Sequence, residues 1–152
     1  MISIYKFFIS WFTGGVLYFA MEIMMRGYSH FSMFICGGLC FVLVGITGNE
    51  VLATFDSVVV AILGIMILGT IIISSLEFIT GVIVNVILGL QVWDYSNLEY
   101  NLLGQICPMF SGIWCLISLP CVYIDSLMRK YIYGEDVKYI RRVEKYQPDL
   151  YE

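Results

Sequence analysis

The feature that most constrains this chain is a long apolar segment, residues 58–90, which few polar side chains interrupt. A membrane-spanning α-helix needs about 20 predominantly apolar residues. The segment is therefore long enough for one tilted helix that projects past the bilayer, or for two helices broken near Ser74 and Ser75. That serine pair contains no Gly or Pro turn signal, so we favour one long helix.

Composition extends the same conclusion to the rest of the chain. The 152 residues are 60% hydrophobic and 13% charged, whereas a soluble domain is about 45–50% apolar and about 25% charged. One small core cannot bury that excess, so lipid is the expected solvent. The net charge of -4 and the lack of a basic face exclude nucleic acid as a partner.

Three further apolar segments complete the expected architecture: residues 4–25, 31–47 and 106–124. Residues 48–56 are expected to form a short polar loop, and residues 91–101 a turn. The sequence thus predicts an all-α, polytopic transmembrane helical bundle with four spans over residues 1–128. A fifth span, from a break within residues 58–90, is the alternative.

The positive charge of the chain is concentrated at its end. Six of the eight Lys and Arg residues lie from Arg129 onward, so residues 129–152 are expected to form a cytoplasmic tail of a multi-pass cell-membrane protein. Val137, Ile140, Val143 and Tyr146 recur at helical spacing, which is typical of an amphipathic helix lying on the membrane. Four spans place both termini in the cytoplasm, whereas five would invert the first half.

One carboxylate, Glu77, falls within the long apolar segment. Facing it toward lipid would cost about 2.5–3.5 kcal/mol on insertion scales, so its side of the helix should face protein or a water-filled cavity. Polar and small residues share that side at spacings of three and four: Thr70, Ser74, Glu77, Gly81, Asn85 and Gly89.

A second acid, Glu22, ends the first span and precedes Arg26 by four residues, which is a favourable helical ion-pair spacing. Both side chains either snorkel to the lipid headgroups or form a polar site that faces the bundle interior. His30, the single histidine, begins the second span and is either a solvated interfacial group or a member of that site. We expect the intramembrane polar site to consist of Glu22, Arg26, His30, Glu77 and Asn85.

A polar turn follows the long segment and should close this site at one membrane face. Its aromatic residues suit a membrane interface, and its Asp and Ser can hydrogen-bond nearby backbone amides. Two further residues, an Asn and a Gly, lead into the last span. The expected interfacial motif is Trp93, Asp94, Tyr95, Ser96, Asn101 and Gly104.

The two halves of the chain have a similar layout, in which an acid precedes a polar-aromatic-Ser turn and then a glycine. Glu22 leads to Ser29-His30-Phe31-Ser32, and Glu77 leads to Trp93-Asp94-Tyr95-Ser96. This layout indicates a two-fold internal repeat, which is a common plan among transporters.

Enzyme chemistry has weak support. The chain has five cysteines without a Cys-x-x-Cys pair and one histidine among scattered acids. No catalytic set, cofactor site or metal site is therefore expected.

Three strings carry a family resemblance: Gly15-x-x-Tyr18-x-x-x-Glu22, Arg26-Gly27-x-Ser29-His30-x-Ser32-Met33, and Trp93-Asp94-Tyr95-Ser96 through Asn101-x-x-Gly104. They resemble the CmpB family, also called putative ABC-transporter type IV, over most of residues 5–124. A proline that often precedes the region of Asn101 in that family is replaced here by Glu99-Tyr100. The resemblance implies a permease. Because the chain has no Walker-type nucleotide-binding string, an ABC function would need a separate ATPase subunit.

Three functions follow from these observations. The first is a transport component whose interior polar groups bind or relay a small polar solute or ion. The second is an assembly or regulatory membrane protein in which the same groups lock helices together. The third, with least support, is an intramembrane lipid-modifying enzyme. Expected partners are the lipid bilayer, a separate ATPase or other membrane subunit, and further copies of the chain.

Overall fold

The structure is a computed structural model that describes residues 3–137. It contains the long helices α1 (Ile4–Arg26), α2 (Phe31–Thr54), α3 (Val58–Gly81) and α4 (Pro108–Tyr131). A short π-helix, η1 (Val82–Ile87), continues α3. Four helical segments, with α3 and η1 counted as one, are long and apolar enough to cross a membrane. Over the described residues, the predicted all-α bundle with four spans is confirmed.

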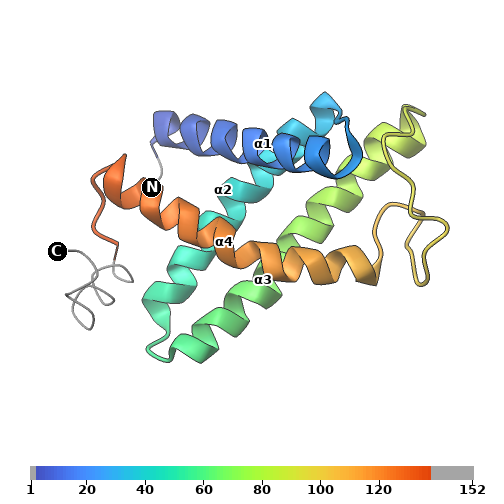
Figure 1. Ribbon diagram of the computed structural model, residues 1–152. Helices are drawn as coiled ribbons and strands as arrows, with labels where there is room; N and C mark the ends of the chain where they lie inside the picture. The colour runs from blue at the N-terminus through green and yellow to red at the C-terminus, as the bar shows by residue number, and fades with distance from the viewer. Residues whose placement is uncertain (1–2, 138–152) are drawn as a thin grey trace.

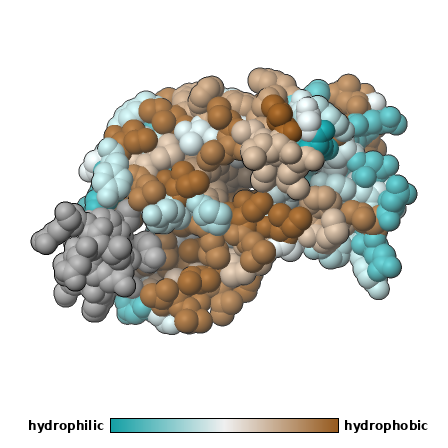
Figure 2. Space-filling model, in the orientation of Figure 1, coloured by the Kyte–Doolittle hydropathy of each residue, from teal (hydrophilic) through white to brown (hydrophobic). Residues whose placement is uncertain are grey.

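Consecutive helices run in opposite directions (Figure 1). The start of α1, the α2–α3 turn and the end of α4 lie at one end of the bundle, and the loop of residues 88–107 lies at the other. Lys6 Nζ donates to Glu135 Oε1 at 2.6 Å, which joins the start of α1 to the segment after α4. Figure 2 shows hydrophilic residues gathered at both ends and hydrophobic residues between them, as expected for a bilayer-spanning bundle.

Glycines allow the helices to approach closely. A Cβ added to Gly14 of α1 would lie 2.2 Å from the Phe41 Cβ of α2, and one added to Gly37 would lie 2.4 Å from the Tyr18 Cβ. At Gly48 of α2, an added Cβ would lie 2.1 Å from a methyl of Val122 in α4. Small residues at helix contacts therefore perform the packing expected in membranes.

The long apolar segment forms one span rather than two. Ser74 lies within α3, and its Oγ is 3.0 Å from the Ser111 Oγ of α4, so the serine pair contributes a helix contact instead of a break. Glu77 is 3% exposed, and Gly81 is also buried. At these two positions the predicted polar side of the helix does face protein.

The predicted polar loop at residues 48–56 is wrong, because α2 continues to Thr54. Val51 and Leu52 are buried within the added turns. Asn49 lies among them, and its side chain donates to the Gly45 carbonyl and to Asp125. Tertiary packing against α4 thus keeps polar residues helical where their local preference is for a loop.

The last helix also exceeds its predicted end, since α4 continues past Ile124 to Tyr131. Pro120 lies inside it, a position that membrane helices tolerate because neighbouring groups satisfy the freed carbonyl. The tail helix predicted over residues 137–146 lies outside the described residues, apart from Val137. The domain boundary at residue 128 and the internal repeat stay predictions.

Candidate functional site

The Glu77 carboxylate lies at the centre of the polar groups in the bundle. It is 3% exposed, and each of its oxygens accepts one hydrogen bond. The Trp114 Nε1 of α4 donates at 2.8 Å, and the Tyr95 hydroxyl of the 88–107 loop donates at 3.1 Å. Both oxygens of the carboxyl group thus have a donor from the protein. Glu77 therefore connects a span to a loop as well as to another span.

The loop that reaches Glu77 is folded by its own side chains. Asp94 Oδ1 accepts from the Ser96 amide at 2.8 Å and from the Ser96 hydroxyl at 2.5 Å. These bonds hold the pKa of the exposed Asp94 carboxyl below its ordinary value. Asn101 Nδ2 donates to the Leu98 carbonyl, and Asn101 Oδ1 accepts from the Gly104 amide. The predicted backbone bonds of the turn are confirmed for Asp94.

Gly104 has a physical reason to be glycine. Its φ is +66°, in the left-handed region, and its carbonyl accepts the Tyr95 amide at 2.8 Å. An added Cβ would lie 2.6 Å from both Asp94 Oδ1 and Ser96 Oγ. Trp-Asp-Tyr-Ser and the later Asn-x-x-Gly are thus two halves of one loop structure.

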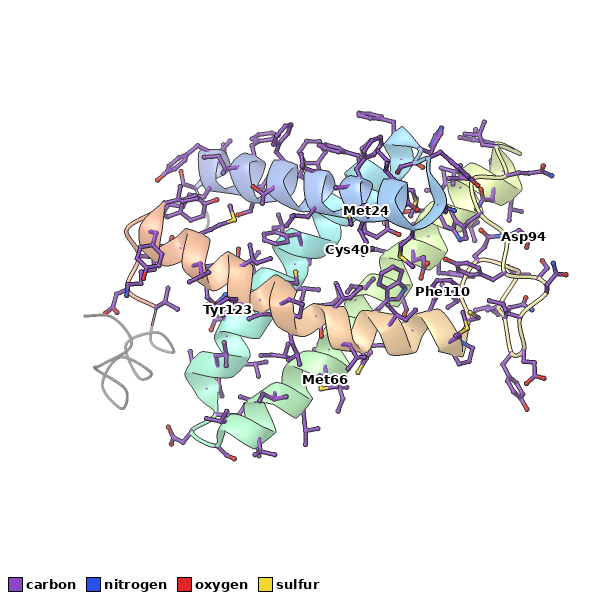
Figure 3. All side chains as sticks on the ribbon, viewed as in Figure 1. Met24, Cys40, Met66, Asp94, Phe110 and Tyr123 are labelled. Carbon is purple, nitrogen blue, oxygen red and sulfur yellow. The ribbon has the colours of Figure 1, made fainter. Side chains whose placement is uncertain are left out.

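This loop turns Trp93 and Tyr95 inward, whereas the sequence favoured an interfacial position for both. The Tyr95 ring stacks on Phe110 of α4 with centroids 4.4 Å apart, and Figure 3 shows Phe110 near the end of α4 that adjoins the loop carrying Asp94. Burial, reinforced by Glu77, raises the pKa of Tyr95, so its hydroxyl stays a hydrogen-bond donor. Trp93 is 6% exposed, and its Nε1 donates to the Gln105 carbonyl at 3.0 Å.

Asn85 joins η1 to the same loop. Its Nδ2 donates to Gln105 Oε1 at 2.8 Å, and its Oδ1 accepts the Val92 amide at 2.6 Å. Asn85 therefore bonds both ends of the loop, at Val92 and at Gln105, rather than Glu77. Gln105, 5% exposed, is a buried polar residue that the sequence prediction missed.

Glu22 takes the buried arrangement rather than snorkelling. It is 7% exposed, pairs with Arg26 and accepts from the Ser29 hydroxyl. Arg26 also donates to the Val92 carbonyl at 3.4 Å, which ties the end of α1 to the loop.

His30 belongs to the start of α2. It caps α2, and its Nδ1 accepts from the Ser32 amide at 3.2 Å and lies 2.8 Å from the Ser32 hydroxyl. Its geometry is that of a helix cap, so the structure brings together Glu22, Arg26, Glu77 and Asn85 around the loop without bonding His30 to them.

A polar depression of about 460 Å³ opens on the loop. Amide, carboxyl and hydroxyl groups provide much of its wall, and Asn85 and Gln105 line it beside the loop motif. It could hold a small polar solute by hydrogen bonding. Among residues 3–137, no group of three or more His, Cys, Asp or Glu side chains is placed to hold a metal ion.

A second polar cluster, at the opposite end of the bundle, escaped the sequence prediction. Asp125 is 2% exposed, accepts from Asn49 at 3.0 Å and pairs with Arg129 at 2.6 Å. Arg129 also forms an ion pair with Glu135, and Glu135 forms a second ion pair with Lys6. The acid–base spacing of four residues at 125 and 129 could have indicated the first pair.

Comparison with known proteins shows that the chain matches the model of one protein family. The model of the family described as "Putative ABC-transporter type IV", ABC_trans_CmpB, matches residues 5–142. This chain belongs to the CmpB family. Neither the curated proteins nor the solved structures yield a match. In this CmpB family member, all the residues predicted for the polar site and the loop motif fall within the matched region.

Proposed function

We propose that this CmpB family protein is the membrane-embedded component of a transport system that handles a small polar solute or ion. The observation that carries the proposal is the bond from Tyr95 to Glu77. It links a nearly fully buried intramembrane carboxylate to the loop that borders a polar depression. Intramembrane acids are costly and commonly mark solute or ion pathways.

In this mechanism the depression receives the solute, and the loop separates it from Glu77. The bond that Tyr95 donates is replaceable by a cation or by a donor group of the solute. Displacing Tyr95 would free one oxygen of the carboxylate and leave Trp114 as its remaining donor. The family name favours a separate ATPase subunit that would drive this exchange, because the chain has no Walker-type string.

Charge also favours an orientation. The Lys and Arg residues of the tail support a cytoplasmic C-terminus in a cell-membrane protein. The loop and its depression then face outward, since the two ends of the bundle lie on opposite sides. A reporter fused to the C-terminus that is active in the cytoplasm alone checks this orientation, and an inactive reporter would reverse it.

An assembly role is the second candidate, and a specific observation favours it. No buried side-chain nitrogen or oxygen among the described residues lacks a hydrogen-bond partner. The polar groups therefore suffice to lock the helices together without a solute.

Purification of tagged protein in mild detergent, with mass spectrometry of what stays bound, tests the proposal. A stoichiometric ATPase or transport subunit is expected, and a clean homo-oligomer without one would contradict an ABC permease. Glu77→Gln should then abolish transport by the reconstituted complex while the protein folds. Glu99→Gln, in an exposed acid of the same loop, is the matched control and should retain transport. Loss of expression or assembly with Glu77→Gln would support the assembly role instead.

A further inference from the structure

A cavity of about 190 Å³ lies within the membrane-spanning part of the bundle. Residues of all four long helices line it, and its walls are almost entirely apolar. Leu17 and Tyr18 belong to α1, and Trp114 and Ile117 belong to α4. A cavity of this size and chemistry stays dry and accepts apolar guests.

The cavity lies where α1 and α4 separate. Toward the loop, the Tyr18 and Trp114 rings bridge the two helices with centroids 6.0 Å apart. Toward the termini, the Ser10 hydroxyl of α1 lies 2.9 Å from the Tyr133 hydroxyl just beyond α4. Figure 2 shows a hollow between the two helices on this face, and Figure 3 shows Cys40 of α2 within the gap. Access is therefore sideways, from the hydrocarbon of the bilayer.

We propose that this cavity binds the acyl chain of a membrane lipid. The solvent at the open side of the cavity is acyl chain, and the apolar walls exclude water and polar solutes. A cavity of about 190 Å³ is too small to hold a helix of a second copy, because an α-helix with its side chains is about 10–12 Å across. Unfilled, the cavity would deprive its lining of van der Waals partners, so a flexible chain from the lipid is the occupant that restores them.

The wall of the cavity reaches the polar site through one residue. Trp114 presents its ring to the cavity and donates its Nε1 to Glu77 at 2.8 Å. An acyl chain packed on this ring would hold it in the orientation that completes the Glu77 bond. The proposal rests on the membrane-spanning fold and not on a transport function, so either can fail without the other.

Fluorescence quenching by lipids with brominated mid-chain carbons tests it, because bromine quenches indole fluorescence on contact. Trp114 is 5% exposed and lines the cavity, so the cavity is the route by which mid-chain bromine would reach its ring. The background variant is Trp11→Phe, which leaves Trp114 and the indole of Trp93 in the loop. The further variant Trp114→Phe in that background defines the signal of Trp93 alone.

We expect strong quenching of the background protein in vesicles of brominated phosphatidylcholine. Filling the cavity by Ile117→Phe should reduce quenching to the level of Trp93 alone. Leu116→Phe, at the neighbouring exposed position of α4, is the matched control and should leave quenching unchanged. If Ile117→Phe fails to fold, Leu17→Phe fills the cavity from the opposite wall, where the residue is already partly exposed to lipid.

Two results would overturn the proposal. Quenching of the background protein that does not exceed the level of Trp93 alone would show that no chain enters, including the case in which a side chain of a second copy fills the cavity. Quenching that persists in the cavity-filling variants would show that bromine reaches Trp114 by another route.

Discussion

Replacing Tyr95 by Phe isolates one hydrogen bond of the Glu77 site. The change removes the hydroxyl that donates to Glu77 Oε1 and keeps the ring that stacks on Phe110. A hydrogen bond to a charged group contributes about 1.5–3 kcal/mol to stability, whereas bonds between membrane helices average about 0.6 kcal/mol. At 3.1 Å the bond is longer than the usual O–H···O distance of about 2.7–2.8 Å, so we expect the lower part of the first range.

We therefore expect Tyr95→Phe to lower the free energy of unfolding by about 1.5 kcal/mol. In a Glu77→Gln background the same change should cost about 0.5 kcal/mol, because the acceptor is then neutral. The difference, a coupling energy of about 1 kcal/mol, is the quantity that a double-mutant cycle measures.

Unfolding by increasing mole fractions of SDS in mixed micelles, followed by loss of helical circular dichroism, supplies the four free energies. Tyr100→Phe, in the same loop at a position 86% exposed, is the control and should change stability by less than about 0.5 kcal/mol. Equal losses in the two backgrounds would refute the reasoning, since the Tyr95 hydroxyl would then not interact with the Glu77 charge.

The remaining predictions concern the loop and the opposite end of the bundle. Gly104→Ala should destabilise the loop by more than about 1–2 kcal/mol, because the left-handed backbone and the close approach to Asp94 both oppose a Cβ. Faster proteolysis of the loop measures this effect, and Gly112→Ala, where an added Cβ meets nothing within 4 Å, should leave the rate unchanged. Arg129→Met should cost about 3–5 kcal/mol because it strands the buried Asp125 carboxylate. Adding Asp125→Asn should recover much of that loss in the SDS titration, and no recovery would mean that packing rather than charge sets the effect.

Local pattern predicted the parts of this protein that depend on lipid as solvent. Runs of apolar residues gave the four spans, because any helix of that length and composition is stable in a bilayer. The acid within such a run, Glu77, had to face protein because lipid exposure is costly. The Asp94 turn was also predictable, since its bonds join residues two positions apart.

Partners distant in the sequence were not predictable in this way. Trp114 bonds Glu77 from 37 residues away, and Asn49 bonds Asp125 from 76 residues away. Each contact depends on which faces of two helices pack against each other in the bundle. The pattern of a single sequence does not specify that packing. The contact between Asn49 and Asp125 also stabilises the end of α2 as a helix, where a loop was predicted over residues 48–56.

The sequence by itself therefore determined that the chain has segments apolar enough to cross a membrane, and which side chains cannot face lipid. These properties follow from transfer free energies that each segment carries independently of its neighbours. Tertiary structure alone decided that the long apolar segment forms one span, that Tyr95 and Trp114 donate to Glu77, and that α1 and α4 part around an apolar cavity. Those outcomes depend on the relative rotation and spacing of helices, which steric fit sets, as the close contacts at Gly14 and Gly37 do between α1 and α2.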